Sequence, residues 1–224
     1  MRDPRAEALL RQIYFTGIQA LPAITATGLL IGLIIILQIS SIAGTQSSTT
    51  VTKILLWLTL RELGPFFTGL IILTRSGTAI STELSTMKLN RELLYLEAMG
   101  IRIDDYLIIP RLLGAMTSAV ILSIYFQLFA LFGGLTLASL LSNIPFSEYG
   151  EAIIENFTFQ ELIISFSKSL IFGLTISGVS IWQGLSVKKS PTEIPQRATK
   201  AVTGSLFLLF LLDVIINLIA AVFK

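Results

Sequence analysis

Two ionisable residues, Arg61 and Glu62, stand side by side within an otherwise apolar stretch of the chain. Charge inside a hydrocarbon layer costs free energy, so such a pair usually marks a transport path or a relay. Neighbouring helical side chains diverge by about 100°, so the two cannot both face lipid. Arg61 therefore either lines a cavity or anchors the helix near the outer membrane surface by pairing with lipid phosphate or Glu62. Pro65 follows and predicts a kink near residues 60–61.

The remaining residue types restrict the chemistry further. The chain has no Cys and no His, which excludes disulfides, thiolate metal sites and imidazole bases. No G-x-x-x-x-G-K-[ST] motif occurs, so there is no P-loop for ATP. We therefore predict no catalytic residue, no metal site and no cofactor on this chain. Lys168 and Asp213 could pair between two apolar segments, but their expected depths differ, so we predict separate roles.

A short polar segment after the Arg61 stretch is the second candidate for function. We expect the chain to leave the membrane near Arg75 and to form a helix of about nine residues, with Asn90 as its N-cap and Gly100 just past its end. A helix this short is marginal alone, so it must pack on something. It either packs on the protein's own spans or docks in a groove of a cytoplasmic partner.

These residues need membrane-spanning elements to position them. Of the 224 residues 53% are hydrophobic and only 13% are charged, whereas a soluble domain has about 25% charged residues. Five segments are long enough to cross a bilayer core of about 30 Å. They are residues 21–43, 54–80, 107–141, 162–187 and 201–223. Gly133 and Gly134 in the third segment indicate a bend, a close helix contact or a break, and we predict one tilted helix rather than a re-entrant hairpin.

Lysine and arginine residues indicate the orientation. They gather before the first segment and in two of the loops, at Arg2, Arg5, Arg11, Lys88, Arg91, Arg102, Lys188, Lys189, Arg197 and Lys200. Of the other two loops, residues 44–53 hold only Lys53 and residues 142–161 hold no basic residue. The N-terminus is therefore expected in the cytoplasm and the C-terminus outside. Residues 1–20 read either as a helix in the headgroup plane or as a cytoplasmic tail that is merely helical. The net charge of +2 gives no indication of nucleic acid.

Four motifs within this arrangement resemble the MlaE-type permease family. They are RELGP at 61–65, TRSGTAISTELSTM at 74–87, LEAMGI at 96–101 and YLIIPRLL at 106–113. Ser85 stands where the family pattern has Gly, and residues 193–196 depart from a Gly-Val-Gly-type turn. The resemblance implies one permease domain over residues 1–224. It would be an all-α polytopic membrane protein with five spans, an interfacial helix at 1–20 and a cytoplasmic coupling segment at 83–105.

The resemblance also implies a function and partners. The family is the membrane subunit of ABC transporters that move phospholipids between membranes with MCE proteins, in the bacterial inner membrane or the plastid inner envelope. It implies a second copy of the permease, a cytoplasmic ATPase pair that holds ATP and Mg, and an MCE protein on the outer face. The lipid-binding residues would be Arg61, Glu62, Leu63, Gly64 and Pro65. The ATPase-coupling residues would be Glu83, Thr86, Met87, Glu92, Glu97, Met99 and Gly100. A permease for another hydrophobic solute and a non-transporting scaffold remain the alternatives.

Overall fold

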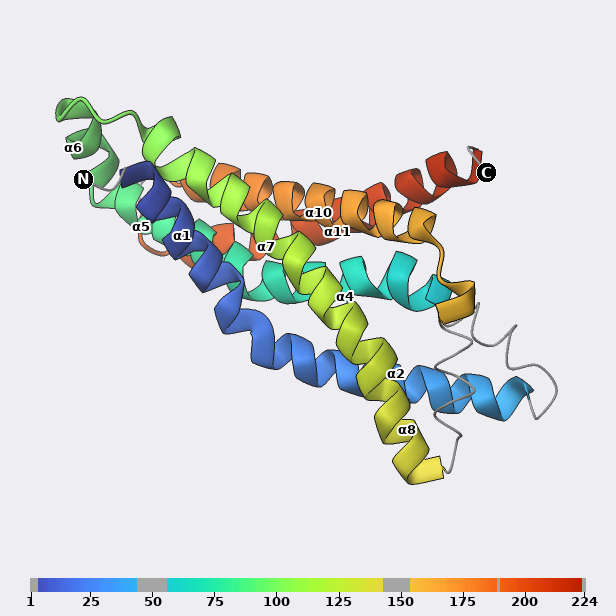
Figure 1. Cartoon of the computed structure of the whole chain (residues 1–224). Helices are drawn as coiled ribbons and strands as arrows, with labels where there is room; N and C mark the ends of the chain where they lie inside the picture. Colours follow the sequence, from blue (N-terminus) through green and yellow to red (C-terminus); the bar gives the residue numbers. More distant parts are fainter. Residues whose placement is uncertain (1–3, 44–55, 143–153, 189, 223–224) are drawn as a thin grey trace.

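The computed structural model describes residues 4–43, 56–142, 154–188 and 190–222, and every regular element within these ranges is a helix. Five helical stretches are long and apolar enough to cross a membrane. They are Glu7–Gln38, Trp57–Leu89, Asp104–Leu137, Phe159–Leu185 and Glu193–Val222. These helices confirm the predicted all-α polytopic membrane fold. The two ends of the chain lie at opposite ends of the molecule (Figure 1).

The first stretch changes direction part-way. Helix α1 (Pro4–Thr16) packs along α7 (Ile109–Leu128), and the 3-10 turn η1 (Ile18–Ala20) then leads into α2 (Leu21–Ala43) (Figure 1). A side chain at Gly114 of α7 would meet the Gln12 side chain of α1 at 2.6 Å, so the small residue permits this close approach. Helix α1 is thus held against the bundle along its length.

The second stretch is one continuous helix. It consists of η2 (Trp57–Leu63), α4 (Gly64–Ile72), η3 (Leu73–Gly77) and α5 (Thr78–Leu89), and both η segments are π-helical. The backbone stays helical past Arg75, because Ser76 and Gly77 are buried and Gly77 lies against α10. Packing there outweighs their low helix propensity. Residues 83–89 of the predicted coupling segment are therefore the last turns of this helix.

A separate short helix, α6 (Glu92–Ala98), follows after a tight turn. The prediction that Asn90 is its N-cap is wrong. Because α5 continues to Leu89, Asn90 caps the end of α5, and Arg91 precedes α6 in the left-handed region with φ 60°. Gly100 has φ +78° just beyond the end of α6, a conformation that glycine adopts without a steric penalty, as its predicted position requires.

The third stretch is also unbroken. It contains η4 (Asp104–Ile108), α7, η5 (Phe129–Gly133) and α8 (Gly134–Ser142), which confirms one helix in place of the re-entrant hairpin. Gly133 ends the π-helical segment η5, and Gly134 lies in a close contact between helices. A Cβ at Gly134 would lie 2.6 Å from the backbone of Gly32, so α8 and α2 touch through their main chains.

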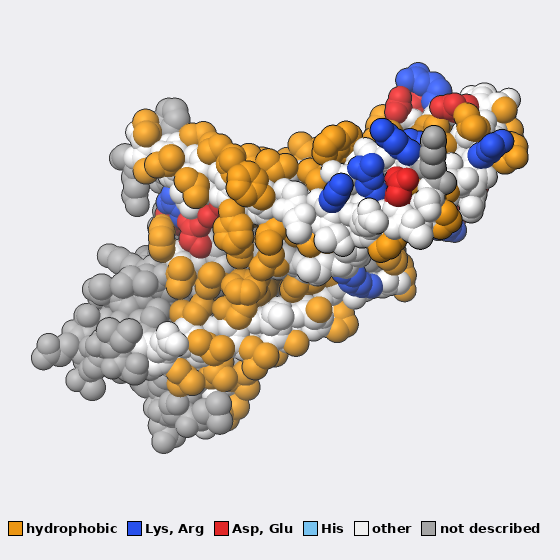
Figure 2. Space-filling model, turned by 180° about the vertical axis from the view of Figure 1, so that it is seen from behind, with side chains coloured by type: hydrophobic (Ala, Val, Ile, Leu, Met, Phe, Trp, Pro, Cys, Tyr) orange, Lys and Arg blue, Asp and Glu red, His pale blue; other side chains and the backbone are white. Residues whose placement is uncertain are grey.

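Helix α10 (Phe159–Leu185) is the centre of the bundle and contacts α7, α11 (Glu193–Val222), α5, α4 and η2. The main apolar core lies around Ile72, Phe126, Phe172 and Leu209, which are all buried. Figure 2 shows hydrophobic side chains over the middle of the molecule, whereas most visible charged side chains gather at the end that carries α6. This distribution is that of a protein with an apolar belt.

Candidate functional site

A network of charges joins three helices toward the end of the bundle opposite α6. We call it the charged cluster and define it as Arg61, Glu62, Glu161, Lys168, Asp213 and Asn217. Its members come from η2, α10 and α11. The cluster therefore links the second, fourth and fifth long helices. The second and fourth are not consecutive in the sequence and meet only because the chain folds.

Lys168 is the centre of the charged cluster. Its side chain is fully buried, and its Nζ lies 2.7 Å from Oε2 of Glu62 and 2.8 Å from Oδ1 of Asp213. The expectation of separate roles for Lys168 and Asp213 is therefore wrong. The four-carbon stem of lysine bridges the difference in depth between the two backbones, which a comparison of positions along the spans does not take into account.

Arg61 is held by longer contacts. Its Nε donates to Oδ1 of Asn217 at 3.3 Å and lies 3.4 Å from Oε1 of Glu62, and its Nη1 lies 3.8 Å from Oε2 of Glu161. Its guanidinium carbon is 5.8 Å from the ring centre of Trp57, a half-exposed residue at the start of η2. Both cations are buried, since Arg61 is only 7% exposed, but the lysine has carboxylates at 2.7 and 2.8 Å whereas the arginine has only longer contacts, beside an exposed aromatic ring.

Asn217 and Glu161 complete the charged cluster and were not predicted as site residues. Asn217 donates from Nδ2 to Glu62 at 3.1 Å and to Asp213 at 3.4 Å. It follows Asp213 by four residues, so the two share one helix face, and this spacing within an apolar segment is the signal that could have identified it. Glu161 lies in the first turn of α10, outside the predicted fourth span of 162–187.

A further unpredicted residue, Gln127 of α7, supports the backbone that carries Arg61. The Gly64 N–H bonds to the carbonyl of Thr59, five residues earlier, so the helix is in the π register. In that register the carbonyl of Leu60 would pair with residue 65, but Pro65 has no N–H. The amide Nε2 of the buried Gln127 donates to this carbonyl instead, at 3.1 Å.

The same amide explains the neighbouring glycine. A Cβ at Gly64 would lie 2.5 Å from Nε2 of Gln127, so only glycine leaves room for the amide. Gln127 also donates to Ser165 of α10 at 2.6 Å. One extra residue in a helical turn rotates the side chains before it by about 100° around the helix axis relative to those after it. The π segment therefore sets the directions of Arg61 and Glu62. An amide within a long apolar run is the signal that could have indicated Gln127.

The five predicted lipid-binding residues therefore fall into two groups. Arg61 and Glu62 enter the charged cluster, where their side chains meet partners from other helices. Gly64 and Pro65 are buried and shape the π segment, and Leu63 packs against the main apolar core. Arg61 and Glu62 are thus part of the charged cluster, whereas the next three residues shape or pack the helix that carries them.

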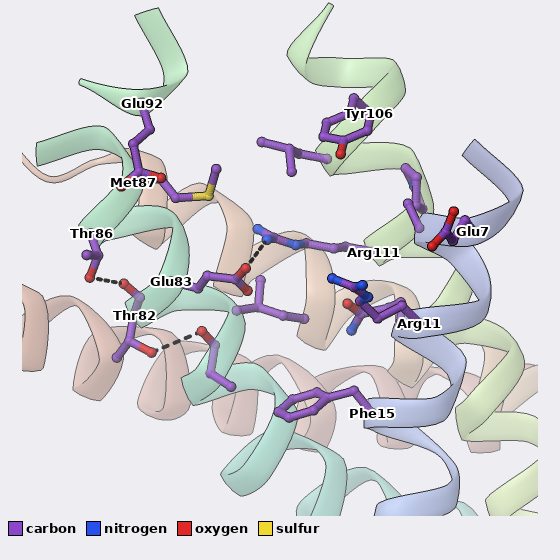
Figure 3. Close-up of a pocket in the computed structure, with 16 residues that line it drawn as sticks. Glu7, Arg11, Phe15, Thr82, Glu83, Thr86, Met87, Glu92, Tyr106 and Arg111 are labelled. Atoms are coloured by element: carbon purple, nitrogen blue, oxygen red, sulfur yellow. Dashed lines mark hydrogen bonds and ion pairs between the residues drawn. The ribbon is translucent and has the colours of Figure 1, made fainter. Parts of the chain in front are cut away.

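A cavity of about 970 Å³ lies at the other end of the bundle, between α1, α5 and α7 (Figure 3). We call it the α1–α7 cavity. Arg111 of α7 points into it, and its Nη2 lies 3.0 Å from Oε1 of Glu83 on α5. Glu7, Arg11 and Phe15 of α1 face the same space.

The predicted coupling residues divide between this cavity and the surface of α6. Glu83, Thr86, Met87 and Glu92 line the α1–α7 cavity, and Glu92 also accepts from Nδ2 of Asn90 at 3.0 Å. Glu97, Met99 and Gly100 lie on the exposed end of α6 and the turn after it. Two large apolar side chains that were not in the predicted set, Leu94 and Tyr95, are exposed there with Met99.

Comparison with known proteins decides the family. A family model described as Permease MlaE matches residues 9–219, a range that includes the charged cluster and every residue lining the α1–α7 cavity except Glu7 and Ala8. The chain belongs to the MlaE permease family. This permease is 27% identical over 213 residues to a probable ABC transporter permease protein of Rickettsia typhi, with 93% of this chain and 81% of that protein covered.

Two further relatives of this MlaE-family permease have informative names. The intermembrane phospholipid transport system permease protein MlaE of Haemophilus influenzae is 25% identical, over 94% of this chain and 82% of its own length. A probable ABC transporter permease protein of Pyropia yezoensis is 23% identical, over 93% and 80%. The permease is therefore a membrane subunit of the ABC transporter type and is not itself an enzyme.

Proposed function

We propose that this permease moves phospholipid between membranes, powered by a cytoplasmic ATPase on separate chains. The observation that carries the proposal is the difference between the two cations of the charged cluster. Lys168 is fully buried and lies 2.7 and 2.8 Å from two carboxylates, whereas Arg61, also buried, has no ionic or hydrogen-bonding contact shorter than 3.3 Å with the described residues. A phosphate that approaches Arg61 past Trp57 exchanges weak contacts for charge-assisted hydrogen bonds. The name of the Haemophilus influenzae relative supports phospholipid as the substrate.

Lys168 has a different role in this proposal. It offsets one of the two negative charges of Glu62 and Asp213 from within the bundle and so reduces their repulsion of a phosphate. Glu62 is held between Lys168 and Arg61, so movement of η2 relative to α10 changes the surroundings of Arg61. Lipid affinity then differs between two arrangements of the helices, which is the requirement for driving transport with ATP.

The coupling to the ATPase runs through one helix. The stretch Trp57–Leu89 continues without a break from the charged cluster to the turn before α6. Exposed Leu94, Tyr95 and Met99 on α6 offer apolar anchors for a groove in the ATPase, with Glu97 at their edge. Force applied to α6 reaches Arg61 through this helix. ATP and Mg belong to the ATPase.

The remaining parts of the proposal concern assembly and place. The permease works as two copies, with an ATPase pair at the α6 end and an MCE protein at the other end. The membrane is the bacterial inner membrane, with the plastid inner envelope as the alternative. The N-terminus faces the cytoplasm, as the gathering of charged side chains at the α6 end supports (Figure 2).

Reconstituted transport tests the proposal directly. The assembled complex is purified, its subunits and bound lipid are identified by mass spectrometry, and transfer of labelled phospholipid between vesicles is measured with ATP and with a non-hydrolysable analogue. The proposal predicts bound phospholipid and transfer that requires hydrolysis. Retention of a different solute would favour the permease for another hydrophobic compound, and absence of ATP-dependent transfer in an intact complex would favour the scaffold.

A further inference from the structure

The α1–α7 cavity contains a buried arginine with unused hydrogen-bonding capacity. Only 6% of Arg111 is exposed, and its Nη2 pairs with Glu83. Its Nη1 is buried and has no hydrogen-bond partner among the described residues. A buried donor left without a partner costs free energy on the order of 1–3 kcal/mol, and more when it is charged. The cavity in front of it is large enough to hold the missing acceptor.

The opposite wall carries a second cation. Arg11 of α1 and Arg111 of α7 reach into the same space from two sides, as Figure 3 shows. Two guanidinium groups that converge on one space form a typical site for a phosphate group, because each presents a planar set of N–H donors. The two arginines lie on different helices, so a ligand between them also fixes α1 to α7.

Acidic residues of the cavity restrict the kind of phosphate. Glu83 is already paired with Arg111, and Glu92 accepts from Asn90. Glu7 lies on α1 one helical turn before Arg11 and faces the cavity. A phosphate between the arginines would place an attached amine within reach of Glu7. With two arginines for the phosphate and Glu7 for the amine, the lining of the cavity suits a zwitterionic headgroup better than a free inorganic anion.

The surroundings of the cavity are those of a membrane surface. Apolar side chains line it between the charged groups, namely Phe15, Ile80, Met87, Leu107 and Pro110. On α1, Leu10 and Tyr14 are more than half exposed, and so is Ile18 in the η1 turn that follows. An amphipathic helix with exposed apolar residues lies in the headgroup layer, where phospholipid is the abundant phosphate.

We propose that the α1–α7 cavity binds the phosphate headgroup of one resident phospholipid, held between Arg11 and Arg111. This lipid is a structural ligand of the permease at the end opposite the charged cluster, and it is distinct from the lipid that the proposed function transports. By joining α1 to α7 next to Glu83, it also stiffens the end of the bundle that receives force from the ATPase.

The test places a reporter in the cavity. Trp57 and Trp182 are the two tryptophans of the chain, so Phe15→Trp in a Trp57→Phe, Trp182→Phe background gives a single fluorophore at the cavity wall. The permease is reconstituted in vesicles of galactosyl diacylglycerol, an uncharged lipid without phosphate. Phosphatidylcholine with a nitroxide on its headgroup is then titrated in. The proposal predicts quenching that saturates at low mole fraction, above the linear background from random collisions.

Variants assign the quenching to the two arginines. Arg111→Gln should weaken the apparent affinity about tenfold, the loss expected for one charge-assisted hydrogen bond. Arg11→Gln, at an exposed residue that folding tolerates, should weaken it about threefold. Arg102→Gln removes an exposed arginine outside this cavity and should change nothing. Inorganic phosphate at millimolar concentration should not relieve the quenching.

Three results would overturn the proposal. They are quenching that stays linear, an unchanged affinity in both Arg11→Gln and Arg111→Gln, and relief by inorganic phosphate, which would identify free phosphate as the ligand. None of these readouts depends on transport or on Arg61. Failure of the proposed function and failure of this lipid site are therefore separate outcomes.

Discussion

The two ends of the bundle use the same residue types in opposite ways. In the charged cluster, the buried cation Lys168 has two carboxylates within 2.8 Å. In the α1–α7 cavity, the buried cation Arg111 has one carboxylate at 3.0 Å, and its Nη1 has no hydrogen-bond partner in the part of the chain that the structure describes. The first arrangement gives its cation two ionic partners and holds helices together, although Oε1 of Glu62 and Oδ1 of Asp213 have no hydrogen-bond donor among the described residues. The second is open and still has room for an acceptor, which is the property of a binding site.

The same contrast recurs within the charged cluster. Lys168 and Arg61 are both buried, but Lys168 has two carboxylates within 2.8 Å, whereas Arg61 lies beside Trp57 with contacts of 3.3 to 3.8 Å. Tight pairing thus distinguishes a structural cation from one that can exchange partners. Sequence position cannot make this distinction, because both residues are single basic residues in apolar spans.

The largest expected effect comes from removing the buried lysine of the charged cluster. Lys168→Met leaves the partly buried Glu62 and Asp213 without their cation, and breaking a fully buried ion pair costs about 3–5 kcal/mol, which is the upper limit here. We expect a large loss of folded, assembled permease, measured as the thermal unfolding midpoint in detergent and as complex yield. Lys200→Met, at an exposed lysine of α11, is the matched control and should leave both unchanged. A wild-type midpoint for Lys168→Met would contradict the structural role.

The next effect concerns the support beneath Arg61. Gln127→Leu removes the donor to the Leu60 carbonyl and should destabilise the π segment by about 1–3 kcal/mol. With Trp182→Phe, Trp57 is the single fluorophore at the start of that segment. Loss of the π register should rotate Trp57 and change its quenching by brominated lipid. Ser139→Ala on α8, whose hydroxyl bonds within its own helix, is the control. Unchanged quenching in Gln127→Leu would show that the amide does not set the register.

Residue patterns predicted much of this fold, and the reasons for the errors are physical. Long apolar runs specify helices, so the five long helices and the unbroken helix through Gly133 follow from the sequence. The continuation of the second helix to Leu89 depends on packing of Gly77 against α10, which is a tertiary effect. The Lys168–Asp213 pair depends on side-chain reach between helices, and the role of Gln127 depends on a neighbour 67 residues away.

A smaller effect is expected at the exposed end of α6. Tyr95→Ala removes an apolar anchor that is 64% exposed in this chain. If the ATPase groove covers it, binding should weaken by about 2 kcal/mol, roughly 30-fold, as for an interface hot spot. The measurement is the dissociation constant of the ATPase for detergent-purified permease. Tyr14→Ala, at an exposed tyrosine of α1, is the control, and equal affinities in the two variants would place the ATPase elsewhere.

The smallest effect is expected from charge at the same surface. Glu97→Lys reverses an exposed carboxylate at the edge of the apolar anchors, and rim charges change association rate more than affinity. We expect a severalfold slower association of the ATPase at low salt, with the difference vanishing at high salt. Glu92→Lys should act less on association, because Glu92 lies toward the α1–α7 cavity. A larger effect of Glu92→Lys than of Glu97→Lys would show that the ATPase docks on the cavity side of α6 and would contradict this assignment.

The central claim is that Arg61 is the cation that exchanges partners, and Lys168 the one that does not. The most direct measurement is ATP-driven phospholipid transfer per assembled complex for Arg61→Gln, with Lys200→Gln, at an exposed lysine outside the coupling segment, as the control. The predicted result is normal assembly with transfer at least tenfold slower, because one charge-assisted bond to phosphate is lost. Wild-type transfer by Arg61→Gln at equal assembly would contradict the claim.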